Sequence, residues 1–203
     1  MVRRIGPLVL LAVTVTSALL ACGGNGKQAA TGDVGFDTLV VYPLNHSGPN
    51  QPSGFYLATQ RATVTDGTEA FDIAFDLTAD GLPIVYPIRL ITSAVGTPHQ
   101  VGLQLTSLYF DVNGCPVGAD TATCWLHTSP AHNFRFDSAY TLTPGQVLVI
   151  ASQSPTCSGF NDPTLYAKLV FDSVHVASGQ MFARTTVDPN CGYVSFEPGL
   201  PTQ

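Results

Sequence analysis

Short segments that alternate apolar and polar residues recur along the chain after residue 36, and Gly, Pro, Asn and Asp separate them. A period of two is typical of β-strands with one buried face, whereas a helix needs a period near 3.6 residues. No window beyond the N-terminal segment sustains the helical period. The segments expected to form strands are residues 38–42, 55–64, 71–77, 82–91, 101–112, 123–127, 147–152, 165–176, 181–187 and 193–196. About ten short strands predict a sandwich or barrel-like fold, and we favour an all-β antiparallel β-sandwich with no substantial helix.

Residues 71–77 show the clearest alternation, so a strand there would have one apolar face and one mixed face. The apolar face consists of Phe71, Ile73, Phe75 and Leu77. Asp80-Gly81 then supplies a turn and residues 82–91 run back, so residues 70–92 are expected to form a hairpin. Because proline lacks an N–H, Pro83 and Pro87 predict that the returning strand is an edge strand or a bulged one.

The dipeptide Phe-Asp occurs six times, at residues 36, 71, 75, 110, 136 and 171. It could be an acidic active-site motif, but we favour strands that point the aromatic ring inward and the solubilising acid outward. Asp72 and Asp76 share a strand face, and four residues of strand separate them by about 13 Å. The carboxylate pairs of glycosidases lie within roughly 5–9.5 Å, so these two residues alone do not form such a pair.

The N-terminus has the three parts of an export signal. Arg3 and Arg4 are positive, residues 5–20 are almost wholly apolar, and Ala21 is a small residue before the expected cleavage point. A membrane-spanning helix needs roughly 20 apolar residues, so this run is short for one. The sequence Leu-Leu-Ala-Cys at 19–22 resembles the lipobox of bacterial lipoproteins. The resemblance implies that the Cys22 sulfur carries diacylglycerol and that cleavage makes Cys22 the acylated N-terminus. An ordinary secretory signal with an incidental cysteine is the alternative.

Three parts of the chain follow from this interpretation: a signal peptide at 1–21, an acylated cysteine with a flexible tether at 22–36, and one β-domain at 37–203. The tether is rich in small and polar residues (GGNGKQAATGDVGF) and fully extended reaches at most about 45–50 Å. Two or more acyl chains anchor a protein stably. Gly23 follows the cysteine, where an aspartate would by the family's sorting rule indicate the inner membrane, so the resemblance implies the outer membrane in a cell with two membranes.

The net charge of the chain limits the kinds of partner that it can bind. Without residues 1–21, six basic side chains face 14 acidic ones, a formal net charge of −8. Such a chain has no electrostatic footprint for nucleic acid and no basic face for anionic lipid. Charged residues make up only 11% of the sequence, which fits an exported domain better than a cytosolic one.

Four cysteines remain beside Cys22, and an even count in an exported chain predicts two disulfides with three possible connectivities. Cys115 and Cys124 bracket eight turn-forming residues, so we favour that pair together with Cys157–Cys191. Structural zinc sites usually need cysteines two to four residues apart, and this chain has no such pair.

The sequence shows no nucleophile elbow, no phosphate-binding glycine loop and no zinc-protease motif, so we do not expect an enzyme. An envelope hydrolase is the remote alternative. His127 and His132 flank Thr-Ser-Pro-Ala, and a turn there could bring both imidazoles to one metal or haem. Solvent-exposed loop histidines are the other interpretation of this pair.

Four segments, AFDIAFDL (70–77), PGQVLVIAS (144–152), LYAKLVFDSV (165–174) and NCGYVSF (190–196), are similar to those of HmuY-like lipoproteins. The resemblance covers roughly residues 70–197 and implies an acylated all-β protein. It also implies haem as a cofactor, held by a pair of axial side chains and passed to an outer-membrane receptor. The function expected is therefore a membrane-anchored lipoprotein that binds a ligand or partner without catalysis. The alternative is a structural or interaction domain of the cell envelope with no small-molecule ligand.

Overall fold

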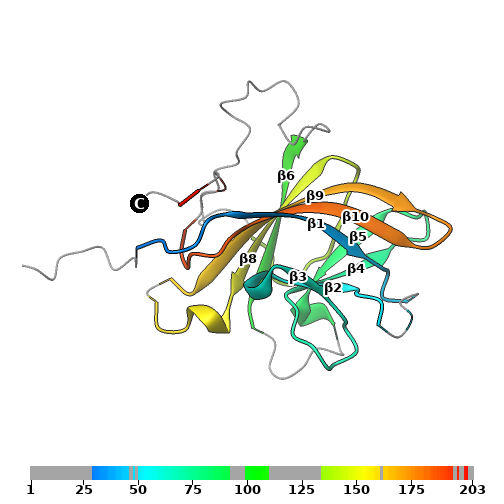
Figure 1. Ribbon diagram of the computed structural model, residues 1–203. Coiled ribbons are helices and arrows are strands. Elements are labelled where there is room, and N and C mark those ends of the chain that lie inside the picture. The colour runs from blue at the N-terminus through cyan, green and yellow to red at the C-terminus, as the bar shows by residue number, and fades with distance from the viewer. Residues whose placement is uncertain are drawn as a thin grey trace, which may run out of the picture.

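The computed structural model describes residues 29–45, 48, 50–91, 99–109, 134–160, 162–193, 196 and 199–200. These residues form two five-stranded sheets in which every pair of neighbouring strands is antiparallel (Figure 1). The prediction of an all-β sandwich of about ten strands is confirmed. In the described part of the chain the helical elements are single 3-10 turns, and none is long and apolar enough to cross a membrane.

Sheet A contains the long strands in the order β1-β10-β9-β8-β6. Their bounds are β1 Gly35–Val41, β6 Val101–Tyr109, β8 Gln146–Gln153, β9 Thr164–His175 and β10 Gln180–Asp188. Sheet B contains shorter strands in the order β3-β2-β4-β5-β7. Their bounds are β2 Gly54–Tyr56, β3 Arg61–Thr63, β4 Ile73–Leu77, β5 Pro83–Pro87 and β7 Tyr140–Thr141. The 3-10 turns are η1 Leu57–Thr59, η2 Ile88–Leu90 and η4 Pro155–Cys157.

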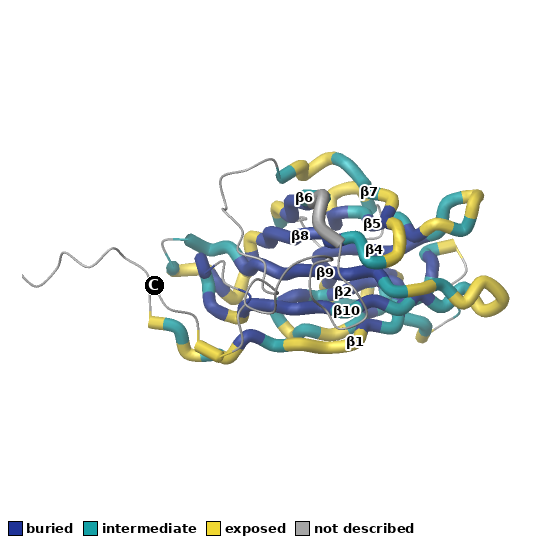
Figure 2. The backbone as a smooth tube through the Cα atoms, turned by 90° about the horizontal axis from the view of Figure 1, so that it is seen from above, coloured by how far each residue is buried: buried dark blue, intermediate teal, exposed yellow. Residues whose placement is uncertain are grey.

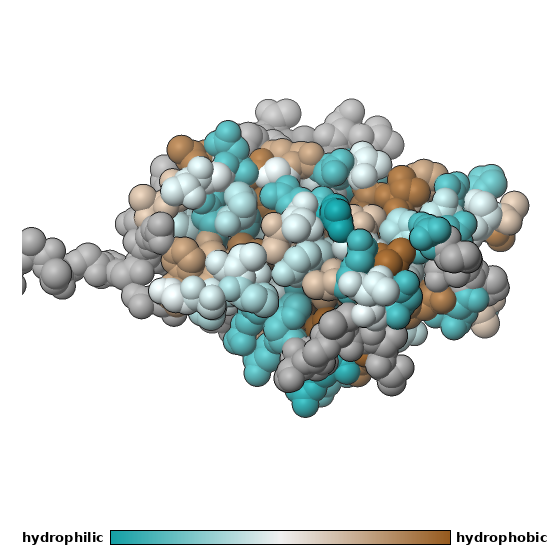
Figure 3. All heavy atoms as spheres, turned by 60° about the horizontal axis from the view of Figure 1, so that its bottom comes forward, coloured by the Kyte–Doolittle hydropathy of each residue, from teal (hydrophilic) through white to brown (hydrophobic). Residues whose placement is uncertain are grey.

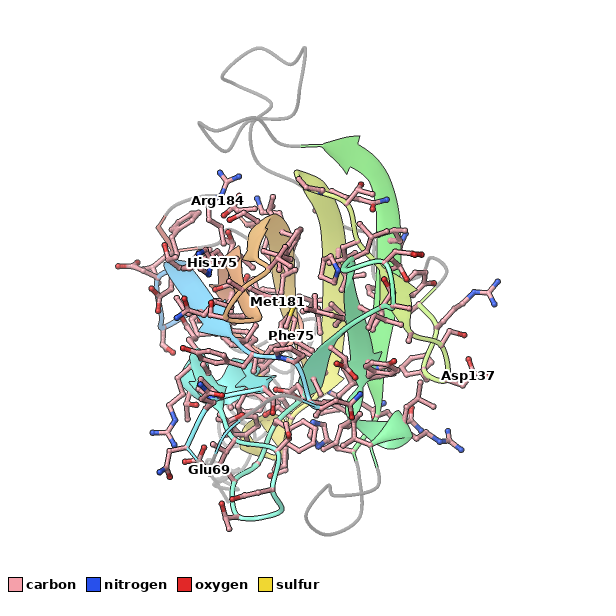
Figure 4. All side chains as sticks on the ribbon, turned by 90° about the vertical axis from the view of Figure 1, so that its right-hand side faces the viewer. Glu69, Phe75, Asp137, His175, Met181 and Arg184 are labelled. Atoms are coloured by element: carbon pink, nitrogen blue, oxygen red, sulfur yellow. A yellow bond between two sulfur atoms is a disulfide. The ribbon has the colours of Figure 1, made fainter. Side chains whose placement is uncertain are left out.

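One large hydrophobic cluster joins residues of both sheets. Its largest fully buried side chains include Phe55, Phe71, Phe75, Leu103, Leu148, Ile150, Leu169 and Met181. Figure 4 shows Phe75 and Met181 in the middle of the molecule, while Glu69 and Asp137 lie at its periphery. Figure 2 shows the buried residues running along β8, β9 and β10, and exposed residues along part of β1 and at several turns. The apolar faces predicted from alternation therefore do meet in one core.

A second, smaller cluster lies on the other face of sheet A. Val149, Ala151, Tyr166 and Phe196 form it, and Phe134 packs against it. Because side chains alternate along a strand, Tyr166 and Lys168 lie on the face opposite to Ala167, which belongs to the main core. Sheet A is thus covered on part of its outer face as well. This explains why residues 165–171 of β9 are all buried.

Two details of sheet B differ from the predictions. Residues 55–64 do not form one strand, because η1 interrupts them and Gln60 adopts a left-handed conformation with φ of 53°. The hairpin prediction is confirmed by β4 and β5, but β5 is not an edge strand, since β7 pairs with it at Ile84 and Val85. No bulge interrupts the β4–β5 register. Pro83 and Pro87 are accommodated because they are the first and last residues of the strand.

The prediction for the Phe-Asp dipeptides is wrong at several positions. Asp72 and Asp76 are buried rather than solvent-facing, and Phe36 and Phe136 are exposed rather than inward. Asp76 accepts hydrogen bonds from Asn45 Nδ2 (3.0 Å) and from the N–H of Leu77 (2.8 Å). Buried Asp76 therefore has hydrogen-bond donors of its own, which the alternation pattern does not reveal.

A disulfide joins Cys157 in η4 to Cys191, so this predicted pair is confirmed. Cys22, Cys115 and Cys124 lie outside the described residues, as do the strand predicted at 123–127 and part of the one at 193–196.

On the face shown in Figure 3, hydrophilic and hydrophobic residues are interspersed.

Candidate functional site

A group of polar side chains from both sheets surrounds Asp72, just before β4. The backbone of Asp72 is fixed to sheet B, since its N–H donates to Phe55 O (2.9 Å) and its carbonyl accepts from the N–H of Ile88 (2.9 Å). Its side chain is only 1% exposed. A buried carboxylate needs hydrogen-bond donors, so its partners define what this site can do.

Among the described residues, three groups contact the Asp72 carboxylate. Oδ2 accepts from the N–H of Leu57 in η1 (2.6 Å), and Oδ1 accepts from Ser152 Oγ. His99 Nε2 lies 2.6 Å from Oδ1. Ser152 belongs to β8 of sheet A, so the carboxylate joins the two sheets through its side chain. With Asp72 ionised, the short contact to His99 requires a proton on Nε2, because a carboxylate oxygen can only accept.

Serine, histidine and aspartate also form the catalytic triad of serine hydrolases, but the order here is different. In a triad the imidazole lies between serine and acid and removes the serine proton. Here Asp72 lies between Ser152 and His99, so the serine hydroxyl donates directly to the acid. Ser152 is fully buried. This geometry positions backbone and side chains and does not prepare a nucleophile.

Tyr56 extends the polar group toward the surface. Burial, and secondly the negative charge of Asp72, raises the pKa of the Tyr56 phenol, and a hydrogen bond with Ser154 opposes the rise. Ser154 is buried one residue beyond the end of β8. The phenol therefore remains protonated through the physiological range and acts as a hydrogen-bonding group.

A second unusual group, the Lys168 ammonium, lies on the outer face of sheet A. Lys168 is 4% exposed, and Nζ is 5.8 Å from the centre of the Phe196 ring. Burial, with a smaller contribution from the positive charge of Arg184, lowers the pKa of Lys168 to about 8. Burial also raises the pKa of its neighbour Tyr166 to about 12. Arg184 itself pairs with Asp172, with Nη2 2.8 Å from Oδ1.

A small pocket of about 60 Å³ lies beside the disulfide. Its lining consists of Ala29, Thr31, Phe160, Pro189, Asn190, Cys191 and Tyr193. Sites for drug-sized ligands and cofactors occupy about 300–1,000 Å³. This pocket is therefore too small for haem or a comparable organic ligand.

The residues predicted as a haem pair, His127 and His132, lie outside the described residues. Of the other histidines, His175 is exposed at the end of β9 and its Nδ1 lies 2.8 Å from Ser178 Oγ. His99 lies in a loop just before β6, and its Nε2 contacts Asp72 Oδ1. Within the described part of the chain, no three His, Cys, Asp or Glu side chains gather as a metal site would require.

Sequence reasoning missed the grouping of Asp72, His99 and Ser152, which come from three distant segments. One local signal was present: Ala74 lies between Asp72 and Asp76 on their strand face, and a fully solvated face would more often carry a polar residue there.

Comparisons of this chain with protein-family models, with curated proteins and with solved structures find no match.

Proposed function

We propose that this protein is an exported lipoprotein, anchored through an acylated Cys22, whose β-sandwich binds a ligand or a partner in the cell envelope without catalysis. The lipobox-like sequence at 19–22 gives the anchor, and the acidic domain that follows gives the binding module. If the cell has two membranes, the outer one is the proposed location.

The observation that carries this proposal is the Cys157–Cys191 disulfide. Structural disulfides persist in oxidising compartments outside the cytosol, where a chain with an export signal arrives. The disulfide accounts for two of the five cysteines, and the favoured Cys115–Cys124 pair would leave Cys22 as the single cysteine available for lipid.

A binding role rather than a catalytic one is supported by the Asp72 group. Its carboxylate accepts from a backbone N–H and a serine hydroxyl inside the domain, and Ser152 is inaccessible to a substrate. These polar groups are used to hold the two sheets together. We therefore place the binding surface elsewhere on the domain.

The anchor is tested by mass spectrometry of the full chain produced in a bacterial host and extracted from membranes. The proposal expects a mature chain that begins at Cys22 and carries acyl chains, and a Cys22→Ser variant that lacks both features. A wild-type chain that is released without lipid would refute the anchor.

The ligand is tested by titrating haemin into the same purified protein and recording the absorption spectrum. A shift of the Soret band that is lost when His127 and His132 are both changed to Ala would assign haem to that pair. An unshifted spectrum would exclude haem, and an envelope protein captured by crosslinking the anchored chain would then identify the partner class. An anchored chain that yields neither ligand nor specific partner would refute the binding role.

A further inference from the structure

The segment before β1 is fastened to the domain by the side chain of one residue, Asn190. Asn190 Oδ1 accepts from the N–H groups of Thr31 (2.8 Å) and Gly32 (3.0 Å), and its Nδ2 donates to Gly32 O (2.7 Å). A little further on, the N–H of Val34 donates to Gly199 O (3.3 Å). The Asn190 side chain therefore bonds to both kinds of backbone group in residues 31–32, two N–H donors and one carbonyl acceptor.

Asn190 is itself held in place by its neighbours in sequence. Asp188 Oδ1 accepts from the Asn190 N–H (2.9 Å) and from Asn190 Nδ2 (2.7 Å). The next residue, Cys191, is fixed to η4 by the disulfide. Both Asp188 and Asn190 are buried, and the hydrogen bonds to Asp188 hold the Asn190 amide in one orientation. Gly32 fits closely, because a Cβ at this position would lie 2.8 Å from Pro189 Cγ.

We infer that this clasp, defined as Asn190 with its hold on residues 31–32, biases the orientation of the domain: it shortens the tether at the disulfide end, so that this end lies nearer the membrane. The inference rests on the proposed lipid anchor at Cys22. Thr31 is nine residues beyond Cys22, a reach of at most about 30–32 Å. Without the clasp and the Val34 contact, the tether would extend to Gly35, thirteen residues beyond Cys22, a reach of at most about 43–47 Å. The clasp therefore keeps the disulfide end of the domain close to the lipid.

The β9–β10 turn then lies farther from the membrane than the clasp end. Gly35 lies opposite Val187 and Val41 lies opposite Met181, so β1 runs about 20 Å from the clasp end to the β9–β10 turn. Figure 1 shows the start of β1 and the C-terminal end on one side of the molecule and the β9–β10 turn on the other. Val176 in this turn is 82% exposed, and Leu200 near the clasp is 57% exposed.

Amide exchange tests the clasp in the full acylated chain, reconstituted in vesicles of phosphatidylethanolamine and phosphatidylglycerol. We expect the amides of Thr31 and Gly32 to be protected in the wild type and to exchange about tenfold faster in Asn190→Ala. Gly32→Ala gives a second test, because it prevents close seating on Pro189 without altering the sandwich core. The control is Asn45→Ala, which removes a hydrogen bond to Asp76 outside the clasp and leaves both amides protected.

Energy transfer tests the orientation in the same vesicles. A fluorescent amino acid is placed at position 200 or at position 176, and the lipid carries the acceptor. In the wild type and in Asn45→Ala, transfer from position 200 exceeds transfer from position 176. In Asn190→Ala and Gly32→Ala we expect a smaller difference between the transfer from position 200 and the transfer from position 176.

The outcomes separate the two proposals. Rapid exchange at Thr31 and Gly32 in the wild type, or exchange that neither variant changes, overturns the clasp whether or not Cys22 is acylated. Equal transfer from both positions in an acylated wild type overturns the orientation. If Cys22 carries no lipid, the anchor is overturned, and the orientation that rests on it is overturned too. Protected amides of Thr31 and Gly32 in that chain would still support the contacts of Asn190.

Discussion

Replacing Asp72 with alanine should destabilise the domain more than any other acid-to-alanine change in the described residues. Asp72→Ala removes the acceptor for the Leu57 N–H and for the Ser152 hydroxyl, and both donors are buried. A buried polar group left without a partner costs about 1–3 kcal/mol, so two such groups lower the free energy of unfolding by about 2–6 kcal/mol. His99 is partly exposed and can turn to water, so it adds little. A domain of this size has about 5–15 kcal/mol in total.

The same geometry predicts that Ser152→Ala destabilises the wild-type protein but stabilises the Asp72→Ala variant. In the wild type it removes a hydrogen bond to a charged group and lowers the free energy of unfolding by about 1.5–3 kcal/mol. In Asp72→Ala the serine hydroxyl is already unpartnered, so its removal raises the free energy of unfolding by about 1–3 kcal/mol. The two substitutions are therefore far from additive, as expected for residues in direct contact.

Equilibrium urea unfolding without reductant measures all four proteins of this cycle, with the m-value checked for constancy. Asp137→Ala, at an exposed acid that Figure 4 places at the periphery, is the control and should stay within about 0.5 kcal/mol of the wild type. Two results would refute the reasoning. One is an Asp72→Ala protein that is as stable as the control. The other is a Ser152→Ala change that has the same effect in both backgrounds.

Three further predictions concern sheet A and its C-terminal end. Changing Cys157 and Cys191 together to Ser should lower the free energy of unfolding by about 3.8 kcal/mol, because the disulfide spans 34 residues, and non-reducing urea unfolding measures it. The folded-state pKa of Lys168, about 8, lies below the ordinary 10.5, so loss of its proton favours the folded state. Stability should therefore rise by up to about 3 kcal/mol between pH 8 and 10.5, and Lys168→Met should flatten this rise in urea unfolding at several pH values. Burial raises the pKa of Asp188 despite the hydrogen bonds from Asn190, so its ionisation opposes folding. Stability should therefore fall as pH rises above about 4, and Asp188→Asn should remove that fall in melting curves from pH 4 to 7.

The strands of sheet A were predictable because their signal is local. Residues 147–152, 165–176 and 181–187 match β8, β9 and β10 to within one residue at each end. Along most of these strands an apolar residue recurs at every second position, and the connections between them carry glycines with positive φ, Gly159 between β8 and β9 and Gly179 between β9 and β10. No information from distant parts of the chain is needed to recognise such a pattern.

The polar interior was not predictable, because the partners of each buried acid are far away in sequence. Asp72 meets Ser152 across 80 residues and His99 across 27. The rule that an acid on a half-buried strand faces water assumes a solvated second face. That face is covered at Asp72 and at Ala74. The two-residue strand β7 was missed for a similar reason, since only its pairing with Ile84 and Val85 defines it.

The two buried acids Asp72 and Asp188 differ in a way that bears on their roles. Both oxygens of Asp72 accept hydrogen bonds, whereas Asp188 Oδ2 is buried without a hydrogen-bond partner among the described residues. A fully bonded carboxylate stabilises the fold that contains it, but a half-bonded one is a net cost that stability alone does not explain. What Asp188 does provide is the orientation of Asn190, through two hydrogen bonds to one oxygen. The cost at Asp188 is therefore accounted for by the orientation of Asn190, whose Oδ1 accepts from the N–H groups of Thr31 and Gly32.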